Sequence, residues 1–180
     1  MSLRIRYLSL VTIFQSSMGA AARHAFGAHF TTELDILKIV HPTIIQPWRE
    51  KISTAKTLTE MKDLRKELSQ YKVLDPACGS GNFLYVAFRE LKRVEMELLN
   101  KIHTVFPKSA AEIGTQSIVS IKQFHGMDYN QFAVELAKVT LMLAKEIAIK
   151  ETRDWVDTMQ VGLGFQMEET LPLDNMNKNI

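Results

Sequence analysis

The sequence has little cysteine, little net charge and no long apolar run. Its one cysteine among 180 residues excludes an internal disulfide and a cysteine-rich zinc site. A single cysteine is typical of a reducing compartment, so we expect a cytoplasmic protein. The histidines show no metal-ligand spacing, so we expect no metal site. No apolar run approaches the roughly 20 residues of a membrane helix, and we therefore expect no membrane span.

The charge balance gives no evidence by itself for a nucleic-acid-binding protein. Lysine and arginine number 22 and aspartate and glutamate 20, and the net charge of +2 is too small to indicate nucleic-acid binding by itself. Apolar residues make up 46% and charged residues 23%, which is ordinary for a globular protein. The length of 180 residues corresponds to about one domain with a real core.

The first part of the chain, residues 1–71, is predicted to be a helical region. The spacing of apolar residues indicates three helices, at residues 13–26, from residue 33 onward and at residues 58–71. Thr32 can cap the second of these helices. Pro42 and Pro47 interrupt the helical signal that follows it.

From residue 72 the pattern changes to alternating strands and helices. The expected elements are a strand at 72–74, a helix from 83 to about 103, a loop at 107–117, a strand at 121–127 and a helix at 130–150. A strand, a glycine turn and a helix in this order open a nucleotide-binding unit. The sequence therefore predicts an α/β fold in which residues 1–71 precede a sheet-containing part at 72–180.

The glycine turn follows the first strand and carries the prediction of a ligand site. Gly79 and Gly81 let the backbone approach a ligand where a β-carbon would collide. The helix that starts just beyond points its free amide groups and the positive end of its dipole at the same place. Cys78 lies within the turn, where its small size is a better explanation than thiol reactivity.

Two common nucleotide sites fit this turn poorly. A dinucleotide site needs glycine or alanine where this chain has Leu84, and an acidic residue about 20 residues further on. The acid at the end of the next strand is Asp128, which lies 53 residues after Asp75. A phosphate-binding loop would need a Gly-Lys-Ser/Thr triplet, which the sequence lacks. The remaining ligand has an adenine, a ribose and a charged amino-acid tail but no phosphates, as in S-adenosylmethionine.

The same residues carry a family resemblance. Residues 73–84, Val-Leu-Asp-Pro-Ala-Cys-Gly-Ser-Gly-Asn-Phe-Leu, resemble motif I of the amino-methyltransferases that act on DNA. Residues 27–31 resemble motif X of these enzymes and residues 126–128 resemble motif II. Motif X upstream of motif I is the order of the gamma-type N6-adenine enzymes. The spacing, together with residues 14–18, is similar to the MmeI-like proteins, which join a nuclease, a methyltransferase and a target-recognition domain in one large chain.

The resemblance implies a partial S-adenosylmethionine-dependent methyltransferase of Rossmann-like fold, with motif X in the helical region. It implies that the backbone of residues 77–81 wraps the methionine part of the cofactor. Asp75 would hold its ammonium group and Asp128 its ribose hydroxyls. Phe30 and Thr31 would close over the methionine end. The full set of expected cofactor-binding residues is Phe30, Thr31, Asp75, Pro76, Ala77, Cys78, Gly79, Ser80, Gly81, Asn82 and Asp128.

Each acidic residue also has a purely structural interpretation. Asp75 and Pro76 could form only a turn that ends the strand, and Asp128 could cap the helix that begins near Asn130. Two further functions stay open for the chain as a whole. One is a nicotinamide- or flavin-dependent enzyme, and the other is a non-enzymatic interaction module of a larger assembly.

The chain departs from the family pattern after motif II. The resembling proteins continue with motif III and with motif IV, an Asn-Pro-Pro-aromatic sequence that holds the amino group of the flipped adenine. No Asn-Pro-Pro occurs in these 180 residues. We therefore expect a fragment that binds the cofactor, has no catalytic residues of its own, and would contact double-stranded DNA mainly through regions outside it.

Overall fold

The computed structural model describes residues 31–113, 116–158 and 180. The chain divides into two compact units, Met1–Thr32 and Glu33–Ile180, and the elements described below belong to the second. The helix expected at residues 13–26 lies outside the described residues.

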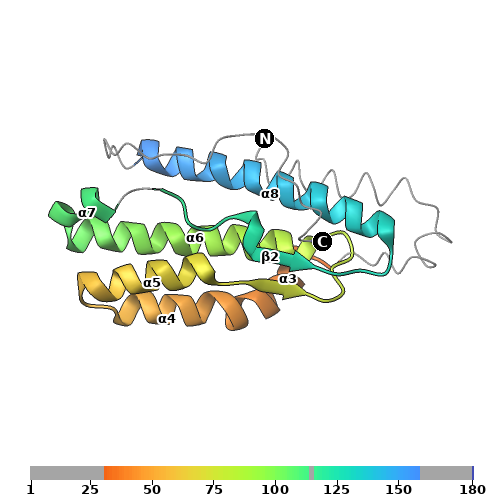
Figure 1. Cartoon of the computed structure of the whole chain (residues 1–180), viewed down its shortest axis with the longest axis horizontal. Helices are drawn as coiled ribbons and strands as arrows, with labels where there is room; N and C mark the ends of the chain where they lie inside the picture. The colour runs from red at the N-terminus through yellow and green to blue at the C-terminus, as the bar shows by residue number, and fades with distance from the viewer. Residues whose placement is uncertain (1–30, 114–115, 159–179) are drawn as a thin grey trace. The chain divides into compact units, whose positions relative to one another are not determined.

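The second unit is mostly helical and contains a small parallel sheet (Figure 1). Its helices and strands, in chain order, are α3 (Glu33–Val40), the π-helical turn η1 (His41–Ile45), α4 (Gln46–Thr54), α5 (Leu58–Gln70), β1 (Val73–Asp75), α6 (Asn82–Val105), α7 (Pro107–Ile113), the 3₁₀ turn η2 (Ile121–Gln123), β2 (Phe124–Gly126) and α8 (Gln131–Thr158). The predicted α/β class is confirmed.

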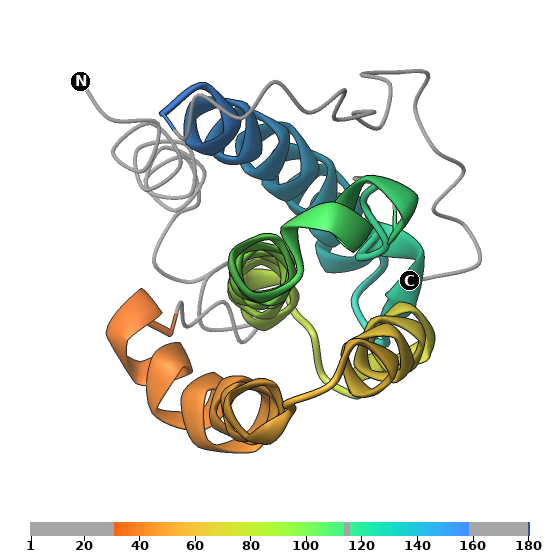
Figure 2. The same ribbon diagram turned by 90° about the vertical axis from the view of Figure 1, so that its left-hand side faces the viewer.

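Helix α6 is the centre of this unit and contacts α3, α5, α8 and both strands. Figure 2 shows α6 nearly end-on, with α8 on one side and α4 and α5 on the other. Side chains around most of its circumference are buried, as expected for a helix with neighbours on several sides. Phe88 of α6 packs edge-to-face on Phe124 of β2, with ring centroids 5.3 Å apart. This contact attaches the sheet to the helix.

The prediction that Pro42 and Pro47 interrupt the helical run is wrong. Residues 33–54 stay helical because the chain widens into the π-helical turn η1. The Gln46 N–H bonds to the His41 carbonyl, five residues earlier in the chain. Both prolines lie at the first positions of a helical segment, where a missing N–H costs little.

The predicted loop at residues 107–117 is also wrong in part, because Pro107–Ile113 forms helix α7. Pro107 begins this helix, a position that suits its fixed φ angle, and the Ser109 N–H bonds to the Phe106 carbonyl. The second strand is shorter than the predicted 121–127. A capping box between Ser120 and Gln123 winds its first residues into a 3₁₀ turn.

The strands β1 and β2 are parallel and each has three residues. Val73 lies opposite Phe124, Leu74 opposite His125 and Asp75 opposite Gly126. In a parallel pair the carboxyl ends lie at the same edge. The turn after β1 and the loop after β2 therefore meet there.

Among the described residues, no helix combines the length and the hydrophobicity needed to cross a bilayer.

The Lys101 ammonium group stabilises the end of α4. It donates to the Ser53 carbonyl at 3.0 Å, to the Ala55 carbonyl at 2.8 Å and to the Ile52 carbonyl. We expect Lys101→Met to lower the free energy of unfolding by about 1–2 kcal/mol, because three carbonyls at a helix C-terminus lose a charged donor. Urea unfolding followed by circular dichroism measures this. Lys62→Met, at an exposed position of α5, is the control, and equal stability of the two variants would contradict the role of Lys101.

Candidate functional site

Hydrogen bonds within the turn between β1 and α6 hold its shape. The Ala77 N–H donates to Oδ1 of Asp75 at 3.1 Å, and the Gly81 N–H donates to the Cys78 carbonyl at 2.8 Å. Gly79 and Gly81 have φ angles of 52° and 82°, in the left-handed region that favours glycine. Gly81 is the N-cap of α6 and provides no side-chain hydrogen bond to the first turn of the helix.

Asp128 connects the loop after β2 to this turn. Its Oδ2 accepts the Gly79 N–H at 2.9 Å and its Oδ1 accepts the Asn130 N–H at 2.8 Å. Two backbone bonds run beside it: the Cys78 N–H donates to the Met127 carbonyl and the Met127 N–H donates to the Asp75 carbonyl, both at 2.9 Å. The two predicted acids therefore lie at the same edge of the sheet, on either side of the glycine turn.

The alternative that Asp128 caps the following helix is wrong. The cap of α8 is Asn130, whose Oδ1 accepts the N–H groups of Phe132 at 3.0 Å and Ala133 at 3.3 Å. Asp128 lies two residues before the cap and faces the glycine turn. Among the described residues, the Asp128 side chain therefore binds the glycine turn and accepts no N–H group from within α8.

The glycines of the site have different surroundings, although the sequence argument gave Gly79 and Gly81 the same role. A β-carbon at Gly79 would meet no heavy atom within 4 Å. A β-carbon at Gly81 would lie 3.0 Å from Cα of Ala137 in α8. Gly81 therefore allows α8 to approach the turn, whereas Gly79 faces open space. Gly126 also has a packing role, because a β-carbon added at this position would lie 2.8 Å from Sγ of Cys78.

The two carboxylates give the site a negative field. Burial raises the pKa of Asp75, and the charge of Asp128 raises it further, while the hydrogen bond from the Ala77 N–H opposes the shift. Burial and the same two carboxylates raise the pKa of the Cys78 thiol to about 11, so this thiol stays protonated at neutral pH. Within the described residues, the ion pairs of lysine and arginine involve neither Asp75 nor Asp128. A cationic ligand group would complement this field.

The remaining predicted residues divide into three groups. Pro76 and Ala77 are exposed, whereas Ser80 and Asn82 are half-buried at the end of the turn. Thr31 belongs to the Met1–Thr32 unit and Phe30 lies outside the described residues, so their contact with the cofactor stays a prediction. Sequence reasoning did not single out Tyr129, which is fully exposed beside Asp128. The sequence feature that could have indicated Tyr129 is an aromatic residue directly after the acid that follows the second strand.

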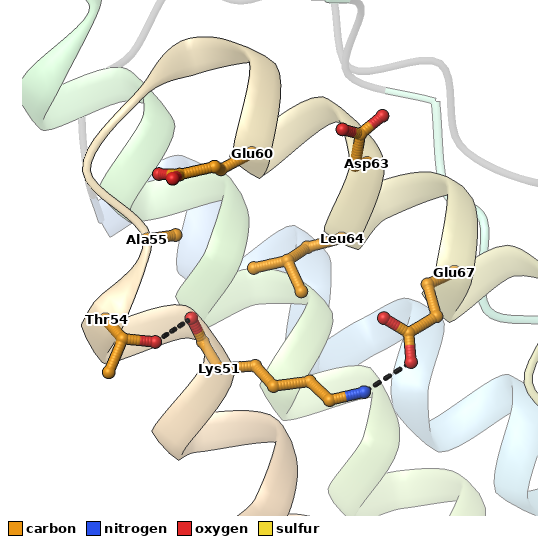
Figure 3. A pocket seen from close by; sticks show the side chains of 7 residues that line it. All are labelled: Lys51, Thr54, Ala55, Glu60, Asp63, Leu64 and Glu67. Atoms are coloured by element: carbon orange, nitrogen blue, oxygen red, sulfur yellow. Dashed lines mark hydrogen bonds and ion pairs between the residues drawn. The ribbon is translucent and has the colours of Figure 1, made fainter.

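A surface depression lies between α4 and α5 and contains no residue of the glycine turn (Figure 3). Its lining residues are Lys51, Thr54, Ala55, Glu60, Asp63, Leu64 and Glu67. Lys51 forms an ion pair with Glu67, and Glu60 accepts the N–H groups of Lys56 and Thr57 at the start of α5. Within the described residues, no group of three acidic, histidine or cysteine side chains could hold a metal ion. The charges of the depression thus largely serve local structure.

Comparison with solved structures identifies a matching fold. The type IIL restriction-modification enzyme MmeI, solved in complex with DNA, is similar with a TM-score of 0.65 and 28% identity. The match covers 81% of this chain and 19% of that chain. The expected partial methyltransferase fold is therefore confirmed.

Comparison with known sequences gives relatives of the same kind. The chain is 27% identical over 146 residues to DNA methyltransferase A of Bacillus subtilis (strain 168), a match that covers 81% of this chain and 16% of the relative. It is 32% identical over 75 residues to the adenine-specific methyltransferase PglX of Streptomyces coelicolor, covering 42% of this chain and 6% of that protein. A putative type II restriction enzyme and methyltransferase of Methanocaldococcus jannaschii is 32% identical over 78 residues, covering 43% of this chain and 6% of that protein. The chain spans less than a fifth of the length of each protein.

The family comparison covers most of the described sheet and helices. The family described as "MmeI, DNA-methyltransferase domain" matches residues 49–180, which include the glycine turn and Asp128. The match extends over more than half of the 180 residues and agrees with the resemblance found in the motifs. The chain therefore belongs to the family of MmeI DNA-methyltransferase domains.

Proposed function

We propose that the glycine turn, Asp75 and Asp128 bind S-adenosylmethionine, and that the chain is the cofactor-binding part of a DNA adenine-N6 methyltransferase. The observation that carries this proposal is the meeting of two carboxylates at one sheet edge, on either side of Gly79, where a β-carbon would face open space. S-adenosylmethionine offers a matching set of groups: an ammonium, a sulfonium and two ribose hydroxyls.

Asp128 has the capacity to hold the ribose. A carboxylate provides about four acceptor sites, and the N–H groups of Gly79 and Asn130 occupy two of them. The remaining lone pairs can accept hydrogen bonds from both ribose hydroxyls. The two backbone bonds also fix the side chain before the ligand arrives, so little conformational freedom is lost on binding.

The amino-acid part of the cofactor has complementary groups on the other side of the turn. Asp75 can pair with the ammonium group, which would offset the repulsion between Asp75 and Asp128. The N-terminus of α6 begins at Asn82, and its dipole favours the carboxylate of the methionine part. The exposed ring of Tyr129 offers a surface on which the adenine can stack.

The choice of adenine-N6 as the target and of DNA as the partner rests on likeness. Motif X precedes motif I, as in gamma-type N6-adenine enzymes, and one relative is named as an adenine-specific methyltransferase. The similar MmeI structure is a complex with DNA. We assign double-stranded DNA as the partner of the whole enzyme, and a cytoplasmic location follows from the same proposal.

Replacement of Asp128 tests the ribose contact. We expect Asp128→Asn to weaken S-adenosylhomocysteine binding by about 1.5–3 kcal/mol, roughly 10- to 150-fold, because a charged acceptor is lost. Isothermal calorimetry measures this, with NAD as a second ligand that should not bind. Asp63→Asn, on the exposed face of α5, is the matched control. Equal affinities of the parent and Asp128→Asn would contradict the assignment, and binding of NAD alone would favour a nicotinamide enzyme.

The two glycines of the turn provide a second test. We expect Gly79→Ala to weaken binding about ten-fold or more, because its β-carbon would point into the open space assigned to the ligand. Gly81→Ala should instead lower the thermal stability more strongly, because its β-carbon would press on Ala137. Calorimetric binding and thermal unfolding of both variants separate these effects. Unchanged affinity of Gly79→Ala would place the ligand elsewhere.

We expect the 180-residue chain to transfer no methyl group to DNA. In the resembling enzymes an Asn-Pro-Pro motif accepts the amino protons of the flipped adenine, and this chain contains no such motif. Extrusion of the base costs a few kcal/mol and positioning contributes roughly 7–11 kcal/mol to a reaction of this kind. A tritium-transfer assay on mixed genomic DNA, with DNA methyltransferase A of Bacillus subtilis as the reference, measures this. Adenine-specific incorporation by the chain would contradict the expectation.

A further inference from the structure

The two strands that carry Asp75 and lead to Asp128 are very short. Each contributes three residues, and an isolated two-stranded sheet is only marginally stable. The correct register nevertheless matters, because a slip by one residue moves a strand by about 3.3 Å and turns every side chain to the other face. Groups outside the ladder must therefore help to set the alignment of β1 with β2.

Gln123 is the residue that joins the two strand starts. Its side chain is buried, with 7% of the residue exposed, and it directly precedes the first residue of β2. Its Nε2 donates to the Leu68 carbonyl at 2.8 Å and to the Tyr71 carbonyl at 2.9 Å, at the end of α5 just before β1. Its Oε1 accepts the Ser120 N–H at 2.7 Å. One side chain thus binds the backbone that leads into each strand.

Only an amide meets all of these requirements at once. The site needs two N–H donors for two carbonyls and one acceptor for a backbone N–H, which is the inventory of a glutamine side chain. A glutamate would keep the acceptor and lose both donors, and a methionine would lose all three bonds while filling a similar volume.

The segment that leads to Gln123 is fixed independently by Glu95 of α6. This carboxylate is buried, with 3% of the residue exposed, and accepts the Val119 N–H at 3.2 Å and the Ile118 N–H. Lys92 balances its charge at 3.0 Å. The segment before β2 therefore reaches Gln123 in a defined position.

We propose that Gln123 is a positioning residue, which sets the register of β2 against β1 and through it holds Asp128 at the glycine turn. A short, continuous series of hydrogen bonds connects the strand register to Asp128. The register places the Met127 N–H on the Asp75 carbonyl and the Cys78 N–H on the Met127 carbonyl, and the Gly79 N–H then meets Asp128. The consequence for ligand affinity rests on the proposed function, whereas the consequence for the turn does not.

Amide hydrogen exchange measured by NMR tests the turn without any ligand. In Gln123→Met, and in Gln123→Glu as a second variant, we expect the Gly79 and Cys78 amides to exchange about ten-fold faster or more, while amides in the core of α6 keep their protection. Gln46→Met is the matched control, because the Gln46 side chain bonds to Glu50 at an exposed position away from the strands. Met61→Ala, in the core of α5, controls for general loss of stability and should speed exchange without singling out the turn.

Calorimetry on the same proteins tests the link to the ligand. The parent should prefer S-adenosylhomocysteine to its 2′,3′-dideoxy analogue, and the Gln123 variants should lose most of this preference, whereas Met61→Ala should keep it. Unchanged exchange at Gly79 in both Gln123 variants would overturn the inference. Faster exchange at Gly79, together with a parent chain that does not bind S-adenosylhomocysteine, would support the register role and overturn the proposed function instead.

Discussion

The hydrogen bond from the Gly79 N–H to the Asp128 carboxylate joins the two strand ends on which the candidate site is built. It links a left-handed turn after β1 to a loop after β2, and Gly79 of the turn lies between the two carboxylates. The bond spans the ends of β1 and β2, and α8 packs beside the turn at Gly81. The α8 contact in turn depends on the absence of a β-carbon at Gly81.

Helix α6 supports both halves of this arrangement. Its N-terminus is the end of the glycine turn, and Phe88 and Glu95 further along the helix hold β2 and the segment before it. Burial raises the pKa of Asp75 and of the Cys78 thiol, and the negative charge gathered at the sheet edge raises both further. Such a site favours a ligand that carries positive charge beside hydrogen-bond donors, and S-adenosylmethionine has both.

Much of this could be predicted from the sequence because the signals are local. Helix starts at Glu33 and Leu58, the strand at Val73 and the turn after Asp75 follow from periodicity, prolines and glycines in short windows. The predictions were wrong or incomplete where residues distant in the sequence, or an unusual helical turn, determine the local structure. Proline was expected to break a helix that a π-helical turn carries onward, and the contact of Gly81 with α8 depends on a residue 56 positions away. The bonds of Gln123 to the end of α5 left no pattern in the sequence.

The central claim is that S-adenosylmethionine binds at the glycine turn between Asp75 and Asp128. An NMR titration of the ¹⁵N-labelled chain with S-adenosylmethionine tests this most directly, because each amide reports its own surroundings. The account predicts that the largest shift changes occur at the amides of residues 77–81 and 128–130, with the depression between α4 and α5 unaffected. Shift changes confined to α4 and α5, or none at Gly79 and Asn130 at saturating ligand, would contradict it.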